Sequence, residues 1–94
     1  MLSSKQRALL RGFANDLPTI LQIGKGGITE TLCRQADEAL LARELIKLRV
    51  LENAPVNARE AAEEIAGRVS AQVIQVIGTR AVLFRQNKES RFQL

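Results

Sequence analysis

The fold is decided in residues 18–30, which read PTILQIGKGGITE. Residues 19–23 form a short apolar run between a proline and a glycine, and such a run predicts a strand that is buried on at least one side. Three glycines follow within residues 24–27. Thr29 is then a suitable N-cap, and Glu30 suits the positive end of a helix dipole. This stretch therefore predicts a strand, a glycine loop and a helix in direct succession.

Hydrophobic periodicity extends this pattern along the rest of the chain. Several stretches have apolar residues every three or four positions, the period of amphipathic helices, and others are alternating or β-branched runs typical of strands. Ser3 with Gln6 can form a capping box at the first helix, and Asn57 with Glu60 can cap the third. The expected helices are residues 4–17, 29–43 and 58–69, and the expected strands are residues 19–23, 45–51, 71–77 and 81–85.

In chain order these elements predict a two-layer α/β fold, α-β-α-β-α-β-β, with a four-stranded mixed sheet. The two strand-helix-strand passages imply three parallel strands, with helices over at least one face of the sheet. The turn Gly78-Thr79 suits a type II′ hairpin, which adds one antiparallel strand. Because 94 residues suffice for one core, we expect one domain over residues 1–86 and a tail over residues 87–94.

The composition excludes several kinds of site. Cys33 is the only cysteine and the chain has no histidine, which excludes a disulfide framework and a Cys/His zinc site within one chain. The usual general base at neutral pH is therefore missing, and we expect no catalytic residues, no metal site and no cofactor. Cys33 lies among apolar residues at helical spacing, so we expect a buried, inert thiol.

The charge of the chain indicates the class of partner. A net charge of +4 and a pI near 10.0 favour polyanions. No apolar run approaches the roughly 20 residues of a transmembrane helix. The first residues, MLSSKQR, are too polar for a signal peptide. We therefore expect a cytoplasmic protein whose partner is nucleic acid rather than a membrane or a small-molecule substrate.

The glycine loop, residues 24–27, has the composition of a phosphate-binding loop. Its glycines leave the backbone free of Cβ atoms and able to adopt positive φ angles, so a ligand can approach closely. The amides of residues 26–28 and the first amides of the following helix should point outward, where the helix dipole favours a negative group. Lys25 adds a mobile positive charge.

Three known loop motifs can be compared with this loop. The P-loop requires Ser or Thr after its lysine, but Gly26 follows Lys25. The dinucleotide pattern G-x-G-x-x-G fails, because residues 28 and 29 are Ile and Thr. The G-x-x-G clamp of KH-type RNA-binding modules does fit. The motif is short, so a tight strand-to-helix turn without a ligand is an alternative of equal weight.

Further basic residues are expected around the glycine loop. The carboxyl ends of the three parallel strands lie at one edge of the sheet, so the loop, Asn53 and the hairpin turn should meet there. If the first helix runs antiparallel to the strand that follows it, its amino end brings Lys5 and Arg7 to that edge, with Arg11 one turn further. Arg34, in the second turn of the second helix, is also close. The candidate RNA-binding residues are Lys5, Arg7, Arg11, Gly24, Lys25, Gly26, Gly27, Arg34 and Arg80.

Aromatic residues are too few to form a base-stacking surface. Only three phenylalanines are present, and Phe13 is expected on a core face. The RRM signature with its aromatic sheet residues is absent. Recognition should therefore depend on phosphate, sugar and shape, with modest sequence specificity.

Several short motifs occur together along the chain. They are Lys5-Gln6-Arg7 with Leu10-Arg11, residues 22–28 (QIGKGGI), Glu38-Ala39-Leu40, residues 42–47 (ARELIK) and Gln75-Val76-Ile77-Gly78. In this order they resemble the CRM domain family, the chloroplast RNA splicing and ribosome maturation domain, in its stand-alone bacterial form. The resemblance runs from about Leu2 to Phe84 and is far more specific than G-x-x-G alone.

The resemblance implies a fold and a function. The fold would be similar to the C-terminal domain of bacterial translation initiation factor three, extended by an N-terminal helix. The function would be that of an RNA-binding assembly factor for precursors of the large ribosomal subunit, while plant members act in intron splicing. The family's loop corresponds to Gly24, Lys25, Gly26 and Gly27, and its basic surface to Lys5, Arg7 and Arg11. The alternative is a ribosome-associated protein-protein adaptor whose loop does not bind RNA.

Overall fold

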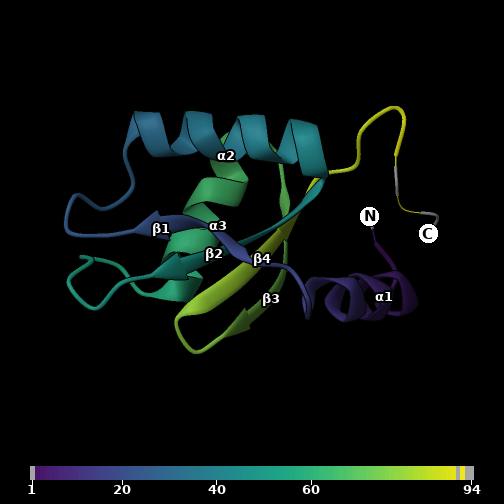
Figure 1. The fold of residues 1–94 in the computed structure, drawn as a ribbon, viewed down its shortest axis with the longest axis horizontal. Coiled ribbons are helices and arrows are strands. Elements are labelled where there is room, and N and C mark those ends of the chain that lie inside the picture. The colour runs from purple at the N-terminus through teal and green to yellow at the C-terminus, as the bar shows by residue number, and fades with distance from the viewer. Residues whose placement is uncertain (1, 91, 93–94) are drawn as a thin grey trace.

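The computed structural model describes residues 2–90 and 92. The order of its helices and strands confirms the predicted fold, α-β-α-β-α-β-β (Figure 1). The predicted capping box forms between Ser3 and Gln6, and the predicted cap of Asn57 with Glu60 is also a capping box. The elements are α1 (Ser4–Ala14), β1 (Thr19–Ile23), α2 (Glu30–Arg43), β2 (Leu45–Val50), α3 (Ala58–Val69), β3 (Gln72–Ile77) and β4 (Arg80–Phe84).

The four strands form one mixed sheet in the order β1-β2-β4-β3. β1 pairs parallel with β2, and β4 pairs antiparallel with both β2 and β3. Thus β1, β2 and β3 point the same way, as predicted. In the hairpin, Gly78 has a φ of +58°, whereas Thr79 has no positive φ. These signs fit the predicted type II′ turn and exclude type I′.

The main hydrophobic core lies between one face of the sheet and the helices α2 and α3. Leu40, Leu48, Ile65 and Leu83 are among its fully buried members. The α3 face toward the sheet is rich in alanine, which lets the helix approach closely. Cys33 is buried in this cluster, which agrees with its predicted environment.

Helix α1 packs on the other face of the sheet and covers only part of it (Figure 1). Its buried residues, Leu10 and Ala14, contact a smaller cluster around Leu45 and Phe84. The helix ends at Ala14, three residues before the predicted end at Leu17. The sheet therefore has helices on both faces, and the face on the α1 side stays open beyond this helix.

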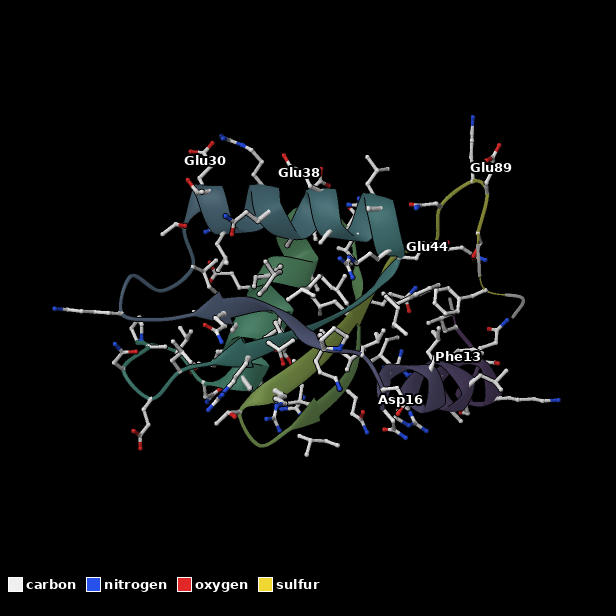
Figure 2. The ribbon with its side chains drawn as sticks, in the orientation of Figure 1. Phe13, Asp16, Glu30, Glu38, Glu44 and Glu89 are labelled. Carbon is white, nitrogen blue, oxygen red and sulfur yellow. The ribbon has the colours of Figure 1, made fainter. Side chains whose placement is uncertain are left out.

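The prediction that Phe13 belongs to a core face was wrong. Phe13 is 52% exposed and Leu9 is 44% exposed, because α1 turns Leu10 and Ala14 toward the sheet instead. The Phe13 ring still has a partner, since its centroid lies 5.4 Å from that of Phe92 (Figure 2 labels Phe13).

Residues 87–90 and 92 of the predicted tail have no helix or strand, but they contact the domain. Glu44 follows α2 with a φ of +65° and is only 1% exposed. Its Oε2 accepts hydrogen bonds from the Asn87 amide at 3.2 Å and from the Ser90 hydroxyl at 2.7 Å (Figure 2 labels Glu44). Residues 91, 93 and 94 of the predicted tail lie outside the described part of the chain.

Candidate nucleic-acid interface

Three connections meet at the edge of the sheet where β1, β2 and β3 end, as predicted. The amide of Leu51 donates to the carbonyl of Ile23 at 2.8 Å, which joins the chain after β2 to the end of β1. The amide of Val50 donates to the carbonyl of Thr79 at 2.7 Å, which joins β2 to the hairpin turn. We call this side of the molecule the glycine-loop edge (left in Figure 1).

The glycine loop contains one tight turn. The amide of Gly27 donates to the carbonyl of Gly24 at 2.9 Å, and Gly27 has a φ of +68°. Neither Lys25 nor Gly26 has a positive φ, which fits a type I turn with glycine at its last position. A Cβ on Gly27 would lie 3.0 Å from the Pro55 Cγ. The backbone therefore requires glycine at position 27.

Gly26 is different, because the fold does not explain it. Its φ is not positive, and a Cβ built on it would meet no atom within 4 Å. An L-residue could occupy this position without strain, and a larger residue would also reduce the entropy of the unfolded chain. What a side chain here would obstruct is the space outside the loop, where a ligand backbone could approach.

The amides of the loop are only partly available to a ligand. We predicted that the amides of residues 26–28 point outward, but that of Gly27 is used inside the turn. Within the described part of the chain, the amides of Gly26 and Ile28 have no hydrogen-bond acceptor. Both follow an exposed lysine, Lys25. The loop thus offers two amides and one ammonium group.

The start of α2 adds to this positive region. Thr29 caps the helix as predicted, because its hydroxyl accepts from the Leu32 amide at 3.1 Å. The amides of Glu30 and the next residue have no acceptor within the helix, as is usual in a first turn, and they lie at the positive end of the helix dipole. Arg34 is exposed and lies one turn further along α2, where we predicted it.

The prediction that the amino end of α1 reaches the glycine-loop edge was wrong. Leu2 and Gln6 lie near Gln72 and Phe84, where β3 begins and β4 ends, which is the opposite edge. The helix lies there because Leu10 and Ala14 cover an apolar cluster at that end of the sheet. Figure 1 shows α1 on the side away from the glycine loop.

The three basic residues predicted on α1 therefore lie apart from the loop. Arg7 donates from Nη2 to the carbonyl of Val73 on β3 at 2.5 Å, so it joins α1 to the sheet. Arg11 is half-buried, and Lys5 is exposed near the amino end of the helix. A role for Lys5, Arg7 and Arg11 in RNA binding stays a prediction, but it no longer follows from a shared edge.

Two basic residues of β2 were missed by the candidate set, and one of them, Arg49, lies near this edge. Lys47 and Arg49 alternate with the buried Ile46 and Leu48 along β2, so they lie on the face of the sheet that carries α1. Arg80 faces Arg49 directly across the β2–β4 ladder. The alternation of apolar and basic residues in 45–51 already indicated that Lys47 and Arg49 point away from the core. Only the order of the strands shows that Arg49 lies beside Arg80.

Among the described residues, no group of three or more His, Cys, Asp or Glu side chains is arranged to hold a metal ion. No helix in residues 2–90 has the length and hydropathy to cross a membrane. The chemistry that this edge offers is that of backbone amides and cations, which bind anions.

Comparison with known proteins shows which family the chain resembles. The family model of the CRS1 / YhbY (CRM) domain matches residues 2–85. The "Probable RNA-binding protein YqeI" of Bacillus subtilis is 41% identical, over 97% of this chain and 95% of its own length. An "RNA-binding protein" of Haemophilus influenzae is 32% identical, over 99% of this chain and 94% of its own length.

A solved structure agrees with this relationship. The solution structure of the hypothetical protein SAV1595 from Staphylococcus aureus superposes with a TM-score of 0.79 at 43% identity. The match covers 95% of this chain and 93% of that chain. The motifs found in the sequence, the fold and these matches agree, and the chain belongs to the CRS1 / YhbY (CRM) domain family.

Proposed function

We propose that this protein binds RNA and that the glycine loop holds the phosphate backbone. The observation that carries the proposal is Gly26, a glycine that the turn does not need and whose missing side chain opens the loop to solvent. Two relatives that match nearly the whole chain are named as RNA-binding proteins. The structural alternative, a tight turn without a ligand, accounts for Gly27 but not for Gly26.

The proposed contacts follow from the groups at the loop. The amides of Gly26 and Ile28 donate to phosphate oxygens, and the start of α2 adds its dipole. Lys25 and Arg34 neutralise the phosphates, with Arg34 able to donate two hydrogen bonds to one of them. These contacts fix position rather than sequence, so specificity is modest.

The proposed target is ribosomal RNA in precursors of the large ribosomal subunit, in the cytoplasm. This finer assignment comes from the resemblance of the motifs to the stand-alone bacterial members of the family. A small domain that contacts phosphates and fits the shape of the RNA, without aromatic residues for base stacking, suits structured RNA. We propose a binding role without catalysis, because the sequence has no histidine and the loop presents amides and cations.

A matched pair of substitutions tests the grip at the loop. Gly26→Asp and Gly67→Asp both add one carboxylate at a glycine whose Cβ has open space and whose φ is not positive. Gly67 lies on the exposed side of α3. We expect Gly26→Asp to lower affinity for large-subunit ribosomal RNA fragments at least tenfold, and Gly67→Asp to change it less than threefold.

A salt titration of the same binding reaction separates the two function hypotheses. A phosphate-binding protein loses affinity with a log–log slope of about −0.7 per phosphate for single strands and about −0.9 for a duplex. We expect a steep slope for the native chain and a shallower one for Gly26→Asp. A flat native slope would favour the protein-protein adaptor, and equal affinities of the two aspartate variants would leave the loop as a plain turn.

A further inference from the structure

The sheet face on the α1 side carries a group of basic residues near the hairpin. The paired positions Arg49 and Arg80 lie on adjacent strands, and Lys47 lies two residues before Arg49 on the same face. Helix α1 covers this face over Leu45, Ile74, Val82 and Phe84, and leaves the end that carries Arg49 and Arg80 exposed. We call Lys47, Arg49 and Arg80 the basic sheet face.

The basic sheet face is a cost to the fold. Residues directly opposite in an antiparallel ladder have Cβ atoms about 5 Å apart, and like charges there are destabilising. Arg49 and Arg80 are both exposed, and within the described part of the chain neither makes an ion pair. Asp16, an acidic residue just after the end of α1, makes no ion pair among the described residues either (labelled in Figure 2).

Four other arginines are bonded within the protein. Arg59 and Arg68 pair with glutamates along α3, and Arg85 bonds Asp37 on α2. Arg7 bonds a carbonyl on β3. Arg49 and Arg80, like Arg34 and Arg43, have no such partner among the described residues, so their charges are available to an external anion.

A shallow hollow lies beside these cations. It has a volume of about 170 Å³ and lies between the end of α1 and the hairpin. Asn15 and Gln75 give it amide groups that both donate and accept hydrogen bonds, and Ile77, 63% exposed, gives it an apolar wall. Lys47 and Arg80 also line it. An anion-binding surface thus adjoins a pocket that has groups able to contact a base.

We propose that the basic sheet face binds a single RNA strand that continues from the glycine loop. Its phosphates lie on Arg49, Arg80 and Lys47, and one unpaired base enters the hollow against Asn15 and Gln75. Unpaired bases expose their edges to such amides, whereas the bases of an RNA duplex do not. The inference rests on RNA being the ligand proposed above.

The strand order supplies a continuous path for this RNA. Gln22, two residues before Gly24, pairs with Arg49, which pairs with Arg80, which pairs with Ile77. This row crosses four strands, a width of roughly 14 Å at about 4.8 Å per strand. It begins beside the glycine loop and ends at the hollow.

A charge-matched pair of double variants tests the surface. Arg49→Gln/Arg80→Gln and Arg43→Gln/Lys88→Gln remove the same charge, but Arg43 and Lys88 lie at the far end of α2 and beyond β4. The probe is a short single-stranded RNA. We expect the first variant to bind at least tenfold more weakly, with a salt slope shallower by about 1.4, and the second to keep the native slope. Equal slopes in the two variants would overturn the proposal.

The thermal stability of Arg49→Gln/Arg80→Gln shows whether a loss of RNA binding comes from the lost charges or from unfolding. Removing the repulsion between Arg49 and Arg80 should leave the thermal midpoint of unfolding unchanged or raise it.

A second variant, Asn15→Ala/Gln75→Ala, tests the hollow, and we expect it to weaken single-strand binding more than duplex binding at an unchanged salt slope. Equal losses for the two RNA forms would overturn the base contact.

The outcome for the loop can be read independently. If Gly26→Asp binds normally while Arg49→Gln/Arg80→Gln does not, the sheet face is supported and the loop grip is wrong. If only Gly26→Asp fails, the loop is supported and this inference is wrong. If the native chain binds neither RNA form, both are wrong.

Discussion

The two edges of the sheet use their charged side chains differently. At the edge where β4 ends, Glu44 bonds the C-terminal segment, and Arg85 bonds Asp37 Oδ1 at 2.7 Å and the Val69 carbonyl at 2.8 Å. At the glycine-loop edge, Lys25, Arg49 and Arg80 have no ion pair or side-chain hydrogen bond within the described residues. Net charge does not distinguish the two groups. The partners of each side chain show which cations are available, and position separates Lys25, Arg49 and Arg80 from Arg43 and Lys88, which are also exposed and without an ion pair among the described residues.

This difference predicts that a substitution changes either the stability of the fold or the affinity for RNA, depending on the edge at which it lies. Residues at the first edge, which we call the anchored edge, should affect unfolding and leave RNA binding intact. Exposed cations at the glycine-loop edge should do the reverse.

The largest expected effect is that of Glu44→Ala. The substitution removes a buried carboxylate and leaves the Asn87 amide and the Ser90 hydroxyl without this acceptor. Alanine also keeps the strained φ of +65°. We expect the free energy of unfolding to fall by about 3 kcal/mol, from the lost charged hydrogen bonds and the unsatisfied donors. Urea denaturation measures it.

Glu44→Gly is the matched control, because glycine adopts positive φ without strain. It should be less destabilising than Glu44→Ala by about 1 kcal/mol. RNA affinity of the folded variants should equal that of the native chain. A fall in affinity at concentrations where the variant is folded would remove the distinction between the two edges.

The next largest effect is that of Gly27→Ala at the glycine-loop edge. The new Cβ would lie 3.0 Å from Pro55 in a backbone at φ +68°, which should cost about 1–2 kcal/mol of stability. Gly26→Ala is the control, and it should stabilise the fold by about 0.4–1 kcal/mol through the unfolded chain. Thermal and urea unfolding of the two variants measure the difference. Equal stabilities would show that the turn does not distinguish its two glycines.

A smaller effect is expected for Arg7→Gln, which tests the residue that the sequence placed near RNA. Arg7 bonds the Val73 carbonyl, so its loss should cost about 1 kcal/mol of stability. The salt slope of RNA binding should stay at the native value, because α1 lies at the anchored edge. A slope shallower by about 0.7, as expected for one lost phosphate contact, would return Arg7 to the RNA-binding set.

The sequence alone predicted the strands, the helices and the loop, because their signals are local. Apolar periodicity, the caps at Thr29 and Asn57, and the glycines of the two turns depend on residues only a few positions apart. The position of α1 could not be predicted in this way. It depends on an apolar cluster of Leu45, Ile74 and Phe84, whose members lie on β2, β3 and β4 and meet because β4 lies between β2 and β3.

The candidate site shows the same division between local and long-range information. Gly24 to Gly27 and Arg34 were found because loop and helix are adjacent in sequence. Arg49 was missed because its neighbour Arg80 is distant in the chain and is brought to it by the ladder register. The assignment of both residues to RNA binding is a proposal that the charge-matched variants address.

The smallest expected effect concerns Glu52, an acidic residue at the glycine-loop edge. It lies between Leu51 and Asn53, whose side chains are within 4 Å of a Cβ built on Gly24. An exposed carboxylate here repels phosphate weakly, so Glu52→Gln should raise RNA affinity about twofold at low salt, with the gain lost at high salt. Glu89→Gln makes the same charge change in the C-terminal segment (Figure 2) and should raise affinity less. Equal gains would mean that net charge, rather than proximity to the loop, sets the effect. A loss of affinity in Glu52→Gln would mean that the carboxylate accepts a hydrogen bond from a base, which would give this edge a sequence preference.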